Sequence, residues 1–405
     1  MRTKLLIFSI LFFILSCGSE EAFQVPGYEN ALENVLTLDL SFGSDEENIK
    51  DEFLLAKPVR IGVSPSGDIV VSDEYSLKVF DENGKEKMIV GRMGQGPGEF
   101  GREPTIWISN TGYLIADESS LGGHLYSIFS PEYKFIEKRN IRHDPILRQF
   151  ANEKNVIIPS VLYKIISLNE HEKIFQFRGQ MQSMRNEDDK ELLLDYLMYN
   201  NGDSLLVLAE YITRAFVSGA YTKKAIPLTG TIFWSELPDR RVVFSHAAHD
   251  FVAEDGNYMY TLNITSLYDF ESEKIKLRYS LVVIPESIKE SLYHPEYFDS
   301  PRRKAQLRDI SRKLRKIGKN TKYYPFIFDI KTDGNYIFVF TYKTNNLGHR
   351  LVEVIDASTK QRISTAYFPI YPWDIRNGYA YTIAKDEEGF PIVEKYKIDP
   401  AVYGK

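Results

Sequence analysis

Cysteine is nearly absent from this sequence, since Cys17 is the only one in 405 residues. The chain can therefore form no internal disulfide and no metal site built from several thiolates. Positive charge is not in excess either, because 50 Lys and Arg stand against 56 Asp and Glu, for a net charge of −6. Without a basic field to attract phosphates, nucleic acid is not expected as a partner.

Long apolar runs are also missing, apart from one near the N-terminus. Arg2 and Lys4 precede an apolar run from Leu5 to Leu15. This run is shorter than the ~20 residues that a transmembrane helix needs. Basic residues followed by a short apolar run are typical of a secretory signal peptide, so we predict that residues 1–16 are one.

A sorting motif follows this run directly. The tetrad Ile14-Leu15-Ser16-Cys17 resembles a bacterial lipobox. The resemblance implies that Cys17 becomes the first mature residue and receives diacylglycerol, with residues 17–32 as a flexible tether to the membrane. The alternative is an ordinary signal peptide followed by an incidental cysteine. Glu20 and Glu21 favour export to the cell surface only weakly, so a periplasmic orientation at the outer membrane stays open.

The body of the chain favours strands. Aromatic residues make up 13% of it, with 26 Tyr and 25 Phe, and long stretches of strong helix formers are few. From residue 57, four short apolar strands alternate with tight turns as far as Val90. Four antiparallel strands joined in this way form one blade of a β-propeller. The fold class that we predict is therefore all-β.

The first turn of this unit recurs along the chain at intervals near 45 residues. It is Gly67 in the first copy and Gly112 in the second, and Gly334 and Gly378 are 44 residues apart. Turns at 152–155, 201–203 and 255–257 fill the interval between Gly112 and Gly334, so the turn count predicts seven blades. Such blades are stable only when stacked in a ring. We expect one domain over residues 33–405, in which Val35–Ser41 completes the last blade beside Val393–Ile398.

One junction between blades carries a family resemblance. Gly91–Phe100, together with the preceding Phe80–Lys85, resembles the blade junction of NHL-repeat propellers, and specifically the 6-bladed β-propeller lipoproteins of Bacteroidota. The resemblance implies an extracytoplasmic lipoprotein without catalytic residues common to the family. The family's usual number of blades is six, so six and seven are both possible.

A basic segment interrupts the strand pattern at residues 285–322. Leu307, Ile310, Leu314 and Ile317 form one apolar stripe at helical spacing, and Gly318 is the expected stop. We expect this helical insertion to pack its stripe on one rim of the propeller. A basic amphipathic helix can also bind an anionic membrane or an acidic partner. The candidate partner-binding residues are Arg308, Arg312 and Arg315.

Candidate ligand-binding residues lie where blades are expected to begin, because propellers bind ligands at the mouth of the central funnel. They are Asp195, Arg214, His249, Asp250, Asp329, Trp373 and Asp374. His246 and His249 form the only close histidine pair. They lie where we expect an inner strand to start at Phe251, and residues three apart on a strand face opposite sides, so we do not expect them to share a metal. We therefore expect no cofactor, with a divalent metal as the less favoured possibility.

No catalytic motif accompanies the blade pattern, and no Gly-x-Ser-x-Gly segment is present. The sequence favours a cell-envelope lipoprotein that acts as a non-enzymatic binding or scaffold module for a glycan, peptide or protein. The alternative is a metal-assisted hydrolase or lyase with its site in the funnel.

Substitution of the candidate lipidation residue tests the anchor. We expect Cys17→Ala to move the protein from the membrane fraction to the soluble fraction, because the thiol that would carry the lipid is gone. Membrane fractionation followed by immunoblotting measures this, with Ser19→Ala as the matched control. Retention of the Cys17→Ala protein on membranes would contradict the assignment.

Overall fold

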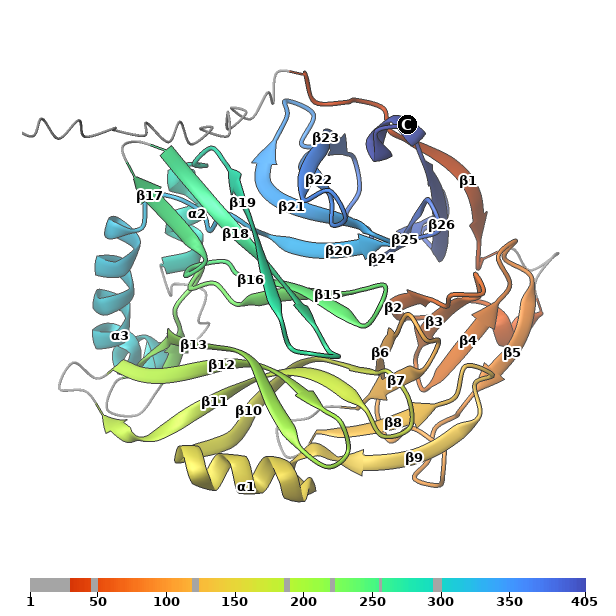
Figure 1. Ribbon diagram of the computed structural model, residues 1–405, viewed down its shortest axis with the longest axis horizontal. Coiled ribbons are helices and arrows are strands. Elements are labelled where there is room, and N and C mark those ends of the chain that lie inside the picture. The colour runs from red at the N-terminus through yellow and green to blue at the C-terminus, as the bar shows by residue number, and fades with distance from the viewer. Residues whose placement is uncertain are drawn as a thin grey trace, which may run out of the picture.

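Six antiparallel sheets stand around a central axis in the computed structural model of the chain (Figure 1). The structure describes residues 30–44, 50–118, 124–185, 190–218, 223–254, 257–293 and 301–405. The predicted all-β propeller is confirmed. Cys17 and the signal peptide lie outside the described residues, so their roles stay predictions.

The first two blades follow the regular four-stranded pattern. The first consists of β2 (Pro58–Val63), β3 (Ile69–Asp73), β4 (Ser76–Phe80) and β5 (Glu86–Val90). The second consists of β6 (Thr105–Ile108), β7 (Leu114–Asp117), β8 (Leu125–Phe129) and β9 (Phe135–Asn140). Between them, Gly91 has a φ of +75°, and a Cβ on it would lie 2.3 Å from the Phe100 ring. Glycine is therefore required where the chain passes from one blade to the next.

The third and fourth blades are larger. The third consists of β10 (Val156–Ser167), β11 (Lys173–Arg185), β12 (Lys190–Asn200), β13 (Leu205–Ser218) and the short β14 (Lys223–Ala225). The fourth consists of β15 (Ile232–Leu237), β16 (Arg241–His246), β18 (Asn257–Ser266) and β19 (Ser272–Arg278), and β17 (Phe251–Glu254) pairs with the first part of β18. We had expected an inner strand to begin at Phe251, and this expectation is wrong, because β17 pairs with β18 away from the axis.

The last two blades return to four strands. The fifth consists of β20 (Asp329–Asp333), β21 (Tyr336–Thr344), β22 (Arg350–Asp356) and β23 (Gln361–Phe368). The sixth consists of β24 (Asp374–Arg376), β25 (Tyr379–Lys385), β26 (Pro391–Ile398) and β1 (Leu36–Phe42). The predicted completion of the last blade by an N-terminal strand is confirmed, because β1 pairs antiparallel with β26.

The prediction of seven blades from the turn count is wrong, and the number is six. Residues 152–155 end a helix instead of joining two strands, and the turn at 201–203 joins β12 to β13 within the third blade. Residues 255–256 of the third miscounted turn lie outside the described residues, but the flanking β17 and β18 both belong to the fourth blade. The first turns of the third and fourth blades are 168–172 and 238–240, and neither contains glycine.

Helix α1 (Pro145–Lys154) was not expected from the sequence. The Asp144 side chain caps its first turn by accepting from the backbone N–H groups of Ile146 and Leu147 at 3.0 Å each. Asn155 ends the helix in the left-handed conformation with a φ of 53°. The Asp144-Pro145 pair is a recognisable helix start, so the signal for this helix was present.

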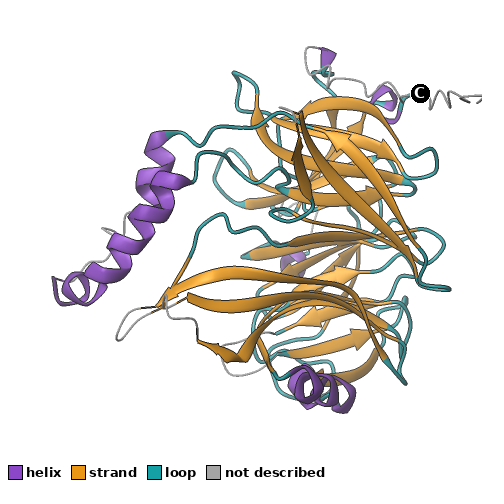
Figure 2. Ribbon diagram, turned by 60° about the vertical axis from the view of Figure 1, so that its left-hand side comes forward, coloured by secondary structure: helices purple, strands orange, loops and turns teal. Residues whose placement is uncertain are grey.

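Helices α2 (Glu286–Tyr293) and α3 (Pro301–Asn320) extend to one side of the ring (Figure 2). The expected docking of the apolar stripe is observed, because Ile310 and Leu314 are buried against Val217 of β13 and Ile226. Within the described ranges, no helix is long and apolar enough to cross a membrane. Gly318 is not the expected stop, since α3 continues to Asn320.

The role of Gly318 is to make room for an aromatic ring. A Cβ on this residue would lie 2.7 Å from atoms of the Tyr293 ring, which α2 packs against α3. Tyr293 in turn donates its hydroxyl to the carbonyl of Pro227 at 3.2 Å. The close approach of the two helices therefore explains this glycine.

Phe42 of β1 tests the closure of the ring. It is 7% exposed and its ring lies 4.7 Å from that of Phe80, so it joins the sixth blade to the first. We expect Phe42→Ala to lower the free energy of unfolding by about 3–5 kcal/mol, the usual cost of an aromatic core cavity. Chemical denaturation measures this.

The matched control is Leu38→Ala on the same strand, where the side chain is 51% exposed. We expect this change to cost under about 0.5 kcal/mol. Equal costs for the two substitutions would show that β1 does not join the blades through its buried side.

Candidate functional site

A cavity of about 260 Å³ lies at the centre of the ring, lined by the inner strands β2, β6, β10, β15, β20 and β24. We call this cavity the funnel. The chain has three tryptophans, and all of them line it: Trp107, Trp234 and Trp373. Each stands on or beside the inner strand of a different blade, so the ring brings together aromatic side chains that are distant in sequence.

Arg60 of β2 is held between two of these tryptophans. The carbon of its guanidinium lies 5.3 Å from the Trp107 ring centroid and 5.6 Å from that of Trp373. Contacts of this kind stabilise a cation through the negative faces of the rings. Burial nevertheless lowers the pKa of Arg60 from its usual value, although the charges of Asp374 and Asp329 oppose this effect.

Lys164 of β10 crosses to the neighbouring blade. Its Nζ donates to the carbonyl of Trp234 at 3.0 Å and lies 4.3 Å from the centroid of that ring. Its pKa is lowered to about 8, mainly by burial; Asp329 acts to raise this pKa and the nearby charge of Arg60 acts to lower it. The funnel therefore holds a lysine that is charged at neutral pH at a cost in desolvation.

The two aspartates that lie in the funnel are already engaged. Asp329 receives Lys331 Nζ at 3.1 Å and also accepts a hydrogen bond from the Tyr371 hydroxyl. Burial acts to raise the pKa of Asp329, but Lys331 and Tyr371 bring it below its ordinary value. The Asp374 carboxylate accepts hydrogen bonds from the backbone N–H of Val63 at 2.8 Å and from that of Ile375 at 2.9 Å.

A second level of the funnel lies nearer the first turns of the blades. Glu236 of β15 accepts from the backbone N–H of Asn110 at 2.7 Å. Burial raises the pKa of Glu236, which favours its neutral form, although Asn110 and the charge of Arg376 act in the opposite direction. Thr332 donates to the backbone carbonyl of Glu236 at 2.7 Å, so β15 and β20 are held together at this level.

Three of the sequence-predicted ligand candidates lie where we expected them. Asp329, Trp373 and Asp374 line the funnel, and their part in ligand binding stays a prediction. Sequence reasoning missed Arg60 and Lys164, which also line the cavity. For Arg60 a signal was available, because it lies on the first strand of the well-marked first blade. For Lys164 there was none, because the turn count placed its strand after the first turn of a blade.

Asp195, His249 and Asp250 are not part of the funnel lining. The miscounted blades are the reason, since Asp195 lies on β12, two strands away from the axis, and the two others lie in the turn between β16 and β17. Arg214 lies on β13, the next strand outward. The predicted funnel position of these four residues is wrong.

Asp195 belongs to a separate buried cluster. Its carboxylate is fully buried and paired with both Arg178 Nε and Arg178 Nη2, the latter at 2.6 Å. His246 Nε2 lies 3.5 Å away from it. Burial acts to raise the pKa of Asp195, but Arg178 and His246 bring it below its ordinary value.

The histidine pair is closer than the sequence suggested. The turn after β16 brings the rings of His246 and His249 to 4.5 Å between centroids, so the expectation that they face apart is wrong. The Asp250 carboxylate accepts a hydrogen bond from the Tyr211 hydroxyl at 2.7 Å and another from the backbone N–H of His246 at 2.8 Å, and these bonds fix the turn. Among the residues that the structure describes, no three His, Cys, Asp or Glu side chains are grouped so as to hold a metal ion.

The predicted partner-binding residues lie on the outer side of α3. Arg308, Arg312 and Arg315 are all exposed, and Arg312 pairs with Asp309 on the same helix at 2.6 Å. Because the apolar stripe of α3 faces the propeller, these arginines face solvent. Their role in binding a partner stays a prediction.

Comparison with known proteins concerns the first two blades. Residues 48–141 match the model of the family DUF5128, described as a 6-bladed beta-propeller. The chain resembles this six-bladed propeller family. The resemblance predicted from the junction at Gly91–Phe100 is thereby confirmed, and the six blades of the ring agree with the family's description.

Solved structures of similar fold share little sequence with this six-bladed propeller. A Bacteroides fragilis protein described as exported has 12% identity and a TM-score of 0.44, over 91% of this chain and 99% of that one. A Bacteroides caccae protein of unknown function has 8% identity and a TM-score of 0.33, over 76% and 81%. The β-propeller domain of a Pyrococcus furiosus trilobed protease has 6% identity and a TM-score of 0.36, over 84% and 95%. A search of curated proteins found no match.

The buried pair of Asp195 and Arg178 generates a prediction on stability. Asp195→Asn removes the carboxylate charge that faces the buried Arg178 guanidinium, so we expect the free energy of unfolding to fall by about 3–5 kcal/mol. Chemical denaturation of the chain from residue 18 to residue 405 measures this. The pKa of Asp195 is depressed in the folded protein. The difference in free energy of unfolding between the variant and the parent should therefore be complete above about pH 4 and should shrink as the pH falls further.

The control is the double variant Arg178→Met with Asp195→Leu, which removes both charges and keeps apolar volume. We expect it to lose clearly less stability than Asp195→Asn alone. A double variant as unstable as the single one would mean that the charges themselves are not the reason.

Proposed function

We propose that this chain is an exported, lipid-anchored protein of the cell envelope that binds a ligand in its funnel without transforming it. The lipobox-like tetrad ending at Cys17 supports the anchor, and the short apolar run before it supports export. A propeller with a cavity on its axis supports binding, since propellers commonly recognise ligands there.

The convergence of the three tryptophans on one cavity carries this proposal. Tryptophan is the rarest large side chain here, and a ring of six blades offers many other buried positions for it. Placing all three against Arg60 and Lys164 combines apolar faces with a few polar groups. Such a combination is what small-molecule sites use to gain affinity and orientation together.

The alternative is a metal-assisted hydrolase or lyase working in the same cavity. It would need a set of His, Asp or Glu ligands around one point. Asp329 and Asp374 are the acidic side chains nearest to such a role, but each already accepts hydrogen bonds from its surroundings. The binding function is therefore the better supported of the two.

The exposed basic side of α3 is a second candidate surface, for a partner protein of the envelope. Docking of Ile310 and Leu314 on the propeller leaves Arg308 and Arg315 directed away from it. Exposed arginines of this kind favour acidic partners through charge and paired hydrogen bonds. This role would add to binding in the funnel and does not replace it.

Thermal shift with and without chelator separates the two functions. For the 18–405 chain we expect EDTA to leave the melting temperature within about 1 °C, and we expect small molecules that raise it to be recovered chemically unchanged. Metal analysis of the same sample and mass spectrometry of the recovered ligand are the measurements. A drop of several degrees on chelation, or conversion of the ligand, would favour the enzyme.

A further inference from the structure

The charges in the funnel are not balanced locally. Lys331 has its partner in Asp329 at 3.1 Å, whereas neither Arg60 nor Lys164 forms a salt bridge within the part of the chain that the structure describes. Asp374, the carboxylate closest to Arg60 in its electrostatic effect, is turned to the backbone N–H groups of Val63 and Ile375. Two cations therefore remain without a carboxylate in contact.

These two cations also keep most of their hydrogen-bonding capacity. Lys164 uses one of its three donors on the Trp234 carbonyl. The guanidinium of Arg60, with five donors, makes its described side-chain contacts with the faces of Trp107 and Trp373. Both side chains are only partly buried, so their remaining donors face the cavity, where a charged acceptor would form strong hydrogen bonds with them.

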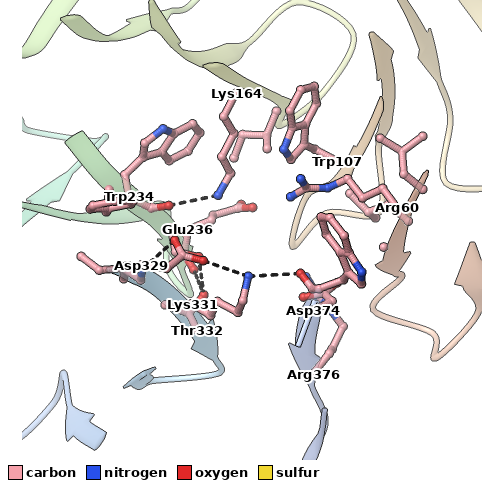
Figure 3. A pocket seen from close by; sticks show the side chains of 18 of the residues that line it. Arg60, Trp107, Lys164, Trp234, Glu236, Asp329, Lys331, Thr332, Asp374 and Arg376 are labelled. Atoms are coloured by element: carbon pink, nitrogen blue, oxygen red, sulfur yellow. Dashed lines mark hydrogen bonds and ion pairs between the residues drawn. The ribbon is translucent and has the colours of Figure 1, made fainter. Parts of the chain in front are cut away.

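Their orientation defines where the acceptor would lie. Figure 3 shows the guanidinium of Arg60 and the ammonium of Lys164 ending in the same central space, with the ammonium directed toward the Trp234 carbonyl. Because the rings of Trp107 and Trp373 both lie close to the guanidinium of Arg60, the N–H edge of this planar group is the part that we expect to meet a ligand. That edge matches the two oxygens of a carboxylate, and a point charge such as Lys164 can complete the pair from the far side.

The other charges of the cavity limit the size and charge of the ligand. Arg60, Lys164, Lys331 and Arg376 line this space together with Asp329, Asp374 and Glu236. Four cations therefore face three carboxyl groups, and one carboxylate on the ligand balances the single excess charge when all three are ionised. A volume of about 260 Å³ is smaller than that of most drug-sized pockets and suits one small molecule, up to about a single sugar ring.

From this geometry we propose that the funnel binds a small monocarboxylate, such as a sugar acid or a hydroxy acid, with its carboxylate held between Arg60 and Lys164. This inference rests on the proposed binding function and gives it a chemical class. Trp107, Trp234 and Trp373 provide apolar faces beside the rest of the ligand. Desolvation of the two cations, costly in the free protein, is compensated when the carboxylate enters.

A matched pair of sugars tests the proposal. We expect isothermal titration calorimetry of the 18–405 chain to show binding of D-glucuronate and no measurable binding of D-glucose, which carries a hydroxymethyl group in place of the carboxylate. DL-lactate is titrated in parallel, and tighter binding of it would identify the hydroxy acids as the ligand source. Inorganic phosphate, which carries more charge at pH 7.5, should bind more weakly than the better carboxylate.

Variants of the two cations locate the site. We expect Arg60→Met and Lys164→Met each to weaken binding by about 10- to 100-fold, which is the range for hydrogen bonds to charged groups. The ligand is whichever of glucuronate and lactate the parent binds more tightly. Arg60→Lys keeps the charge but loses the planar edge, so it should bind with intermediate strength. Lys274→Met, on the exposed outer strand β19, is the control that should bind as the parent does. Circular dichroism melts confirm that each variant is folded.

Several results would overturn the proposal. Absence of carboxylate binding at 10 mM ligand, equal binding of glucuronate and glucose, tighter binding of phosphate, or carboxylate binding that is unchanged in both Arg60→Met and Lys164→Met would each do so. Suppose instead that a neutral molecule binds, that this binding depends on Trp107, and that no charged ligand competes with it. The proposed binding function would then stand, and only the proposal of a carboxylate ligand would be overturned. Failure of the binding function itself would instead appear as conversion of the ligand or dependence on a metal.

Discussion

A blade of this protein can bury its two faces only against its two neighbours, and this constraint shapes the whole ring. Five clusters of buried apolar side chains fill the six boundaries between blades, because one cluster covers both boundaries of the third blade. The boundary between the sixth and first blades depends on β1, because Phe42 reaches across it to Phe80. Pairing of β1 with β26 therefore supplies both the fourth strand of the last sheet and the contact that closes the circle.

Closure of the ring is also what assembles the funnel. Arg60, Lys164 and Trp373 come from three different blades, and their contacts exist only because the inner strands are held at fixed distances around one axis. At the boundary between the third and fourth blades, the bond from Lys164 to the Trp234 carbonyl spans β10 and β15 directly. One lysine thus serves both the packing of the blades and the charge of the cavity. Buried cations reduce stability, so a large apolar framework is needed to hold them in place.

The sequence predicts the regular parts of this structure because glycine marks their turns. Gly67 and Gly112 have φ values of +92° and +87°, which other residues adopt with strain, so the turn of the first blade could be recognised again in the second. The third and fourth blades begin with turns at 168–172 and 238–240, where hydrogen bonds and left-handed non-glycine residues such as Asp239 replace glycine. Gly202, with a φ of +96°, instead lies in the turn at 201–203, which joins β12 to β13 within the third blade. The count of seven followed from this.

The site was predictable to the extent that the blade starts were. Asp329, Trp373 and Asp374 follow from the well-marked last two blades, whereas Asp195 and Asp250 were assigned to the funnel from turns in the miscounted region. Arg60 and Lys164 carry no motif, and only the neighbouring blades give them a common cavity. Local patterns identify which strand is innermost, but which cations lack a counter-ion depends on contacts across the whole ring.

The position of β1 has a mechanical consequence. The segment that would lead to a membrane anchor enters the fold through this strand, which runs antiparallel to β26 from Leu36 to Phe42. Leu32, just before β1, forms backbone hydrogen bonds with Thr365 and Tyr367 of β23. Tension on the N-terminal segment would load these two bonds first and then the ladder between β1 and β26. A protein tethered in this way resists force with the same strand that closes its ring. Rupture of the ladder between β1 and β26 would therefore release the tether and open the ring at once.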